Sequence, residues 1–65
     1  MLKKGLSVDK IEDLVEIVKQ DDDFDVDRWE FKEKAKALWI YDKKGMQTVV
    51  TLKIIDGKIV VNSVW

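Results

Sequence analysis

The stretch from Trp29 to Tyr41 constrains the fold of this 65-residue chain more than any other part, because its residues alternate with a period of two. The even-numbered positions from 28 to 36 are all charged, whereas Leu38 and Ile40 are apolar. A two-residue period over this length is typical of a β-strand with one buried face. We therefore predict a strand over about residues 28–41 with the odd-numbered side chains in the core. These odd-numbered residues are Trp29, Phe31, Glu33, Ala35, Ala37, Trp39 and Tyr41.

A helix over residues 26–38 is the competing interpretation of the same stretch. Lys, Glu and Ala are good helix formers, and Asp27 with Glu30 has the spacing of a capping box. A helix would, however, place the charged residues 32, 33 and 36 on the face that begins with Trp29. That arrangement lacks an apolar stripe, so the strand is favoured.

The length of the predicted strand raises a geometric problem. Its thirteen residues from 29 to 41 would extend about 43 Å at about 3.3 Å each. A domain of this size has a radius of gyration of about 11 Å and a width of about 28 Å. The strand must therefore bend, carry a bulge or project beyond the sheet. Residues 28–34 either curl over the end of the helix, which is the favoured outcome, or pair with the same arm of a second molecule in a homodimer.

A helix is predicted over about residues 7–20. Apolar residues recur there at helical spacing, namely Val8, Ile11, Leu14, Val15 and Val18. Ser7 precedes most of this stripe and is the predicted N-cap, since its hydroxyl can accept a hydrogen bond from a first-turn N–H. Residues 21–27 contain five Asp. They are predicted to form an acidic loop, because carboxylates at the C-terminus of a helix oppose its dipole.

Two turn signals predict the remaining strands, over about residues 46–55 and 58–65. Asp56-Gly57 between apolar segments is typical of a type I′ hairpin and would pair Ile54 with Ile59. Residues 42–45 form the second predicted turn, which would place Tyr41 opposite Met46 and Trp39 beside Thr48. Both turns then place apolar side chains on one face of a sheet.

These elements predict a single α+β domain over residues 1–65, with one N-terminal helix packed on a curved three-stranded antiparallel meander (α-β-β-β). The order of elements resembles the curved-sheet half of cystatin-like and nuclear-transport-factor-2-like folds. The resemblance rests on no motif and implies no function.

The composition predicts neither an enzyme nor a cofactor or metal site. The chain has no Cys and no His, which removes thiolate ligands, the commonest metal ligand and the usual general base. Ser7 and Ser63 have no base marked by the sequence, and three glycines do not make a phosphate loop. The acidic segment lacks the Gly and Glu that a calcium-binding EF-hand loop requires at its sixth and twelfth positions.

Charge and hydropathy give expectations about partners and location. The chain has a net charge of −1, no apolar run of membrane-spanning length and no signal-peptide pattern, so we expect a soluble protein compatible with the cytoplasm. The lysines at 32, 34 and 36 alternate with aromatic residues that could stack nucleic-acid bases. The strand period places these lysines and the aromatic residues on opposite faces, so nucleic acid is not favoured as a partner.

A protein interface is the remaining candidate site. The predicted register aligns Leu38, Val49 and Val64 across the sheet on the face away from the helix, and an exposed apolar patch often marks an interface. The candidate interface residues are Trp29, Phe31, Leu38, Ile40, Val49 and Val64. The first functional hypothesis is a structural domain, natural or engineered, that self-associates and has no specific biochemical activity. The alternatives are a natural module that binds a protein through its sheet face or an edge strand and, more weakly, nucleic-acid binding through the lysine row.

Overall fold

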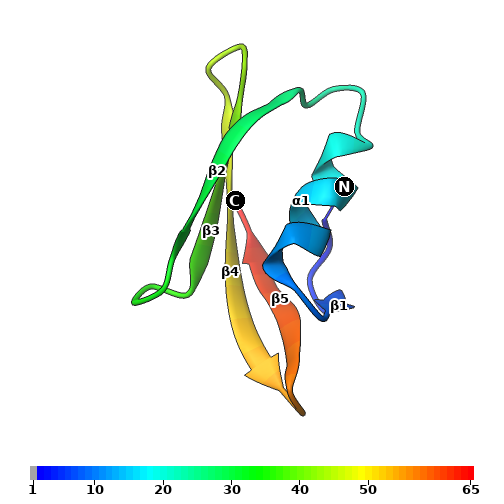
Figure 1. The fold of residues 1–65 in the computed structure, drawn as a ribbon, viewed down its shortest axis with the longest axis vertical. Coiled ribbons are helices and arrows are strands. Elements are labelled where there is room, and N and C mark those ends of the chain that lie inside the picture. The colour runs from blue at the N-terminus through cyan, green and yellow to red at the C-terminus, as the bar shows by residue number, and fades with distance from the viewer. Residues whose placement is uncertain (1) are drawn as a thin grey trace.

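The computed structural model describes residues 2–65, in which one helix packs on one face of a five-stranded antiparallel sheet (Figure 1). In chain order the elements are β1 (Ser7–Val8), α1 (Ile11–Lys19), β2 (Val26–Lys32), β3 (Ala37–Asp42), β4 (Gln47–Ile55) and β5 (Lys58–Val64). The strand order is β1-β5-β4-β3-β2. The antiparallel α+β class is confirmed, whereas the three-stranded meander is wrong because β1 and a separate β2 extend the sheet at both edges.

The predicted long strand is a hairpin. The chain reverses at residues 33–36, where the N–H of Lys36 donates to the carbonyl of Glu33 (3.2 Å) and Lys36 adopts a φ of +48°. β2 therefore folds back on β3 and pairs Phe31 with Leu38. The strand was too long for its domain, as its length indicated. The arm does not curl over the helix but pairs with β3 along one side and forms an edge of the sheet with the other.

The faces of β3 are the reverse of those predicted. β3 pairs Trp39 with Val49 and Ile40 with Thr48, one residue away from the predicted pairing of Trp39 with Thr48. The turn between β3 and β4 is one residue longer than expected, and the N–H of Asp42 donates to the carbonyl of Met46 (2.8 Å). A slip of one residue moves every side chain to the other face. Ile40 is consequently buried beneath the helix, and Trp39 lies on the opposite face.

The hairpin between β4 and β5 is confirmed near its turn. Asp56 and Gly57 have φ angles of +52° and +76°, as a type I′ turn requires, and Ile54 pairs with Ile59. Farther from the turn the pairing shifts, because β5 carries one extra residue between its partners of Leu52 and Thr51. This β-bulge pairs Thr51 with Ser63 rather than with Asn62 as predicted.

The helix begins later than predicted, at Ile11, and its N-cap residue makes no side-chain capping bond. Ser7 is not the N-cap because it belongs to β1, where it pairs with Val60. The preceding residues also bond to β5: the N–H of Gly5 donates to Val61 (2.8 Å), and the N–H of Val61 donates to Leu6 (2.8 Å). Residues 5–8 thus satisfy backbone groups of β5 that a helix from residue 7 would leave unpaired.

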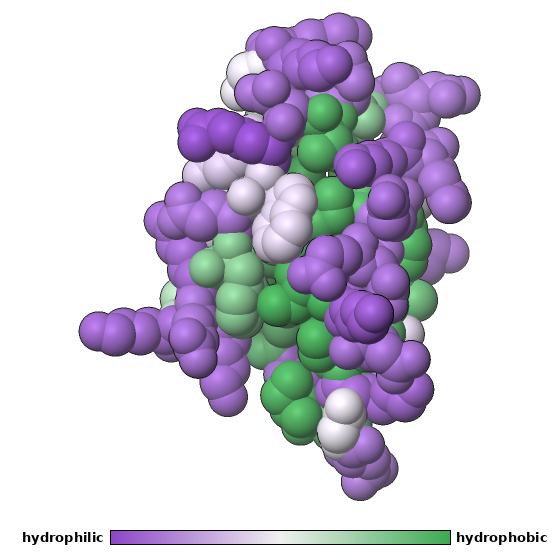
Figure 2. All heavy atoms as spheres, viewed as in Figure 1, coloured by the Kyte–Doolittle hydropathy of each residue, from purple (hydrophilic) through white to green (hydrophobic). Residues whose placement is uncertain are grey.

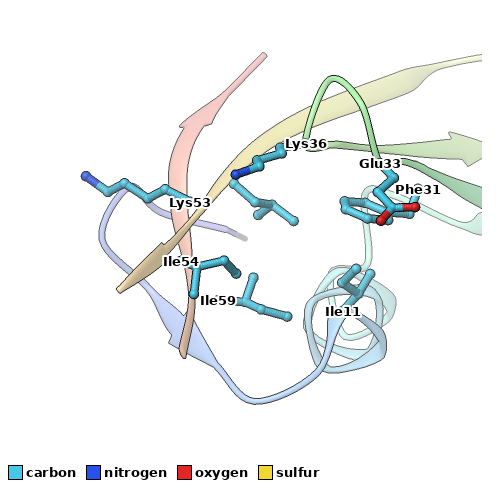
Figure 3. Close-up of a pocket in the computed structure, with 8 residues that line it drawn as sticks. Ile11, Phe31, Glu33, Lys36, Lys53, Ile54 and Ile59 are labelled. Atoms are coloured by element: carbon cyan, nitrogen blue, oxygen red, sulfur yellow. The ribbon is translucent and has the colours of Figure 1, made fainter. Parts of the chain in front are cut away.

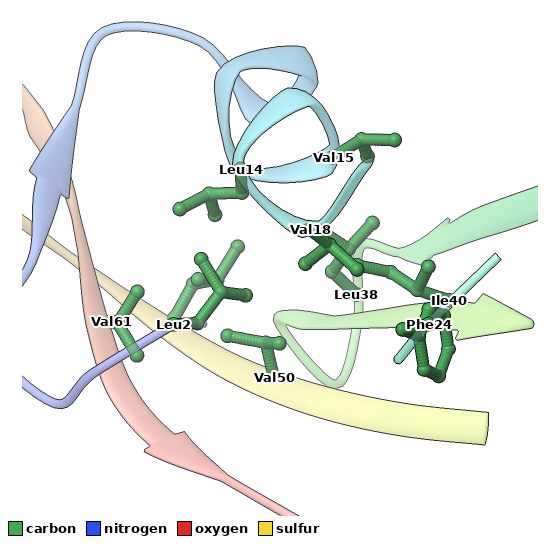
Figure 4. Packing of buried hydrophobic residues seen from close by; sticks show 10 residues of the cluster. Leu2, Leu14, Val15, Val18, Phe24, Leu38, Ile40, Val50 and Val61 are labelled. Carbon is green, nitrogen blue, oxygen red and sulfur yellow. The ribbon is translucent and has the colours of Figure 1, made fainter. Parts of the chain in front are cut away.

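The core lies between α1 and the sheet. Figure 4 shows Leu14 and Val18 of the helix pointing toward the sheet, where Leu38 and Val50 lie. Val15 on the same helix is also buried. Other buried apolar residues of this cluster are Leu2, Phe24, Ile40, Leu52 and Val61. In the space-filling view, hydrophobic residues run between the sheet and the helix, with hydrophilic residues on both sides (Figure 2). Within residues 2–65, no helix has the length and hydropathy needed to cross a membrane.

Asp42 fastens the acidic loop to the sheet. It is only 4% exposed, and its carboxylate accepts hydrogen bonds from the N–H groups of Lys44 and Asp25, the latter at 2.8 Å. The N–H of Lys43 donates in turn to the carbonyl of Asp25 (3.0 Å). The hydrogen bonds from Lys44 and Asp25 hold the pKa of Asp42 below its ordinary value, because they favour the ionised carboxylate.

Candidate binding surface on the open face of the sheet

The helix covers one face of the sheet, and no other element of the described chain covers the opposite face (Figure 1). We call this second surface the open face. Trp39, Val49 and Trp65 lie side by side across its middle. Trp39 pairs with Val49 in β3 and β4, and Val49 and Trp65 exchange two backbone hydrogen bonds of 2.8 and 3.2 Å. Directly paired residues of neighbouring strands share a face, so the three side chains form one row.

Tyr41 extends this arrangement along β3. Its ring and that of Trp39 have centroids 6.5 Å apart and planes inclined by 24°. We call Trp39, Tyr41 and Trp65 the aromatic row. The rings of Trp39 and Tyr41 are half-buried, whereas Trp65 is 80% exposed. The aromatic row therefore presents aromatic surface to solvent on the open face of the sheet.

Two cations from the neighbouring edge strand lie against the aromatic row. The guanidinium carbon of Arg28 is 4.4 Å from the centroid of the Tyr41 ring, and the ammonium of Lys32 is 4.6 Å from the centroid of the Trp39 ring. At exposed sites such a cation–π contact contributes about 0.5–1 kcal/mol. The contacts place positive charge at the β2 side of the row.

Hydrogen bonds hold Trp65 at the other end of the row. Its indole N–H donates to the hydroxyl oxygen of Ser63 (3.1 Å), and the Ser63 hydroxyl is hydrogen-bonded to that of Thr51. The hydroxyl of Thr48 donates to the carbonyl of Trp65 (2.9 Å). Trp65 is thus largely exposed but held in a defined orientation.

Charge is segregated along the chain. Residues 28–65 contain eight Lys and Arg against four Asp and Glu, whereas residues 1–27 contain four Lys against nine Asp and Glu. The first segment builds nearly all of β2 to β5, and the second builds the helix and its flanking loops. Strand alternation places one acid, Glu30, and four bases on the open face. The bases are Arg28, Lys32, Lys53 and Lys58, of which Lys58 forms an ion pair with Asp9. The open face is therefore locally basic although the chain is acidic overall.

The structure separates the six candidate interface residues. Leu38 and Ile40 are fully buried in the core. Val49 lies on the open face, but Val64 pairs with Val50 and so shares the helix-covered face, where it is 36% exposed. Leu38, Val49 and Val64 therefore do not form the predicted patch.

Trp29 and Phe31 lie together on β2, on the same face as the helix. Trp29 is 39% exposed at the edge of the sheet, and Phe31 is half-buried beside the core.

The aromatic row was not among the surfaces predicted from the sequence. A signal was present, since apolar residues that face the core occupy odd positions in β2 and even positions in β3. A change of parity of this kind indicates a turn between two strands.

A pocket of about 250 Å³ lies at the end of the core near the start of α1 (Figure 3). It is lined by Ile11, Phe31, Glu33, Lys36, Leu52, Lys53, Ile54 and Ile59. The figure shows the Lys53 side chain extending away from the pocket, whereas the apolar side chains form its wall. Ile54 is 60% exposed at its margin. This pocket is a second candidate apolar surface, on the helix side of the sheet.

No cluster of metal-ligating side chains accompanies these surfaces in the described part of the chain. Residues 2–65 contain no group of three or more Asp or Glu placed to hold a metal ion. Comparison with protein-family models, with curated proteins and with solved structures gave no match. The chemistry of the open face is therefore the basis for a functional proposal.

Proposed function

We propose that the protein is a binding domain without a reaction of its own, and that it holds an anionic partner on the open face of its sheet. The observation that carries this proposal is the aromatic row with Arg28 and Lys32 against its rings, on a face that no other described element covers. Tyr, Trp and Arg are the residues most enriched where proteins make binding contacts.

The distribution of charge supports an anionic partner. The sheet-forming part of the chain is basic and the helix-forming part is acidic. A partner with negative charge is attracted to the open face and is repelled by the opposite side of the molecule, which orients its approach. The low net charge of the whole chain does not oppose this, because the field near a surface depends on the nearby charges.

Self-association through the open face is less favoured by the same charges. A two-fold dimer would bring the Arg28 and Lys32 side chains of both copies to one interface, and like charges that face each other oppose association. Pairing through residues 28–34 is restricted to the outer edge of β2, since the other edge already pairs with β3. We expect sedimentation equilibrium of the free protein to give a monomer, and a stable dimer would count against this proposal.

The proposal is tested by titrating isotopically labelled protein with three polyanions: inorganic polyphosphate, polyglutamate and a short oligothymidylate. We expect at least one of them to shift the amide signals of Trp39, Tyr41 and Trp65, with an affinity that falls as salt is added. The double variant Arg28→Gln, Lys32→Gln should bind more weakly. A matched control, Lys4→Gln with Lys10→Gln, removes the same charge from the N-terminal part and should bind normally. If no polyanion shifts these signals, the proposal is wrong.

A further inference from the structure

We propose that the anionic partner is a single-stranded nucleic acid whose bases stack on Trp39 and Trp65 and whose phosphates lie near Arg28 and Lys32. This inference rests on the proposed function and names its partner. Surfaces that bind single strands without sequence preference combine aromatic side chains for the bases with positive charge for the backbone. The open face provides both on adjacent strands.

The spacing of the two indoles suits planar rings. Trp39 and Trp65 flank Val49 on the next strands to either side, so their backbones are separated by two strand spacings, or about 10 Å. A base held between two rings needs about 7 Å between the ring planes, since stacked atoms lie about 3.5 Å apart. The two indoles can therefore enclose one base above Val49, or each can stack on a base of its own.

The two indoles differ in what they offer. Lys32 already lies against one side of the Trp39 ring. Trp65 is 80% exposed, and its indole is oriented by the hydrogen bond to Ser63. An aromatic ring that is exposed and yet fixed in place loses little conformational freedom when a base stacks on it. Trp65 is thus the side chain from which we expect the larger contribution to stacking.

The chemistry of the row favours nucleic acid over other anionic macromolecules. An acidic peptide would use Arg28 and Lys32 but has no need of two indoles beside them. A lipid surface would use a broad aliphatic patch, whereas on the open face Thr51 and Ser63 separate Val49 from the other aliphatic residues, Ile55 and Val60. Every nucleotide carries both a planar π-surface and a negative charge, which matches aromatic side chains placed next to cations.

The structure also places a lysine beside the aromatic residues. One continuous strand over residues 28–41, as predicted from the sequence, would have placed lysines and aromatic residues on opposite faces. The turn at residues 33–36 transfers Lys32 to a separate strand, where it lies on the same face as Trp39. Lys34 and Lys36 belong to the turn, so the proposed site uses only Lys32 of the three lysines.

The inference is tested by fluorescence anisotropy with a labelled oligothymidylate, with unlabelled polyphosphate and polyglutamate as competitors. We expect the oligonucleotide to bind at least tenfold more tightly than either competitor at equal charge. Trp65→Ala should weaken oligonucleotide binding about tenfold and leave polyphosphate binding unchanged. Trp29→Ala is the matched control, because Trp29 is 39% exposed on the helix side of the sheet. This variant should bind the oligonucleotide as tightly as the parent protein does.

The outcomes separate this inference from the proposed function. If polyphosphate or polyglutamate binds as tightly as the oligonucleotide and Trp65→Ala has no effect, nucleic acid is the wrong partner and an anion-binding open face still stands. Equal losses in Trp65→Ala and Trp29→Ala would also overturn the inference. If none of the three polyanions binds, both proposals are wrong. Circular dichroism of each variant confirms that a loss of binding is not a loss of folding.

Discussion

Replacing Lys36 with glycine should make the protein more stable, although glycine usually weakens a β-structure. Lys36 adopts a φ of +48° in the turn between β2 and β3. A residue with a Cβ in this left-handed region costs about 1–2 kcal/mol, and glycine avoids that cost. Glycine also makes the unfolded chain more flexible, which lowers the stability by about 0.4–1 kcal/mol. The midpoints of these two ranges differ by about 0.8 kcal/mol, so we expect Lys36→Gly to raise the free energy of unfolding by about 0.5–1 kcal/mol.

The local contacts of Lys36 do not alter this expectation. The Lys36 N–H donates to Glu33 and its carbonyl accepts from Leu52 (2.8 Å), so both bonds use the backbone and survive the substitution. Lys36→Ala removes the long side chain but keeps the cost of the left-handed conformation, and it should not gain stability. Lys34→Gly, in the same turn but without a positive φ, should lose about 0.4–1 kcal/mol.

Urea denaturation followed by circular dichroism measures these differences, and thermal melts check them. For a domain of this size 1 kcal/mol corresponds to about 4–8 °C in melting temperature, so Lys36→Gly should melt about 2–8 °C higher than the parent protein. A loss of stability in Lys36→Gly similar to that in Lys34→Gly would refute the hairpin. It is the result expected if residues 28–41 were one continuous strand, since glycine weakens a strand interior.

Three further predictions follow from burial and charge. Leu14→Ala should lower the free energy of unfolding by about 2–5 kcal/mol, because Leu14 is fully buried. A 65-residue chain has only about 3–10 kcal/mol in total, so urea titration should give a much lower unfolding midpoint than that of the parent protein. The lowered pKa of Asp42 means that its ionised form stabilises the fold above about pH 4. The free energy of unfolding should therefore fall as the pH drops through the folded-state pKa. Urea midpoints measured from acid to neutral pH should show this decline, and Asp42→Asn should make it shallower. Ile54→Thr should change stability by less than about 0.5 kcal/mol because Ile54 is 60% exposed, yet it should reduce the fluorescence of an apolar dye bound in the adjacent pocket.

Turns account for most of the difference between the predicted and observed folds. The Asp56-Gly57 turn was predictable because these residue types readily adopt the positive φ angles that a type I′ turn needs. The turn at residues 33–36 has no Gly, Pro, Asn or Asp, so no turn-favouring residue marks it, and the change of parity between β2 and β3 is its signal in the sequence. It forms because Phe31 and Leu38, its flanking core residues, meet beneath the helix. That contact joins two strands, so the residue types of the turn alone do not reveal it.

The helix shows the same limit at its N-terminus. Its apolar stripe was predictable, and Leu14, Val15 and Val18 are buried as the helical spacing indicates. Its start was not, because residues 5–8 bond to β5, more than fifty positions along the chain. A capping residue such as Ser7 has a local preference worth about 1 kcal/mol, and several strand hydrogen bonds outweigh it.

The open face was not predicted because the turn between β3 and β4 has one residue more than expected. This extra residue reverses which side chains of β3 face the helix.

Packing favours the observed orientation of β3, in which Leu38 and Ile40 face the helix and Trp39 and Tyr41 face solvent. The side chains of Leu38 and Ile40 have no polar atoms, so they fill the core beneath the helix without needing a hydrogen-bond partner there. Trp39 and Tyr41 each carry a polar group that would require such a partner if buried, and on the open face solvent can supply it.

Packing alone does not explain why aromatic residues occupy the open face. Thr and Val form strands as well as Trp and Tyr do, and Thr51 and Val49 already serve in the neighbouring β4. If the open face served only the fold, threonine would stabilise the protein as well as tryptophan does at position 65. The reason is that an 80% exposed side chain adds little to stability. We therefore expect Trp65→Thr to keep the stability of the parent protein while losing affinity for single-stranded nucleic acid. Loss of stability without loss of affinity would show that Trp65 serves the fold instead.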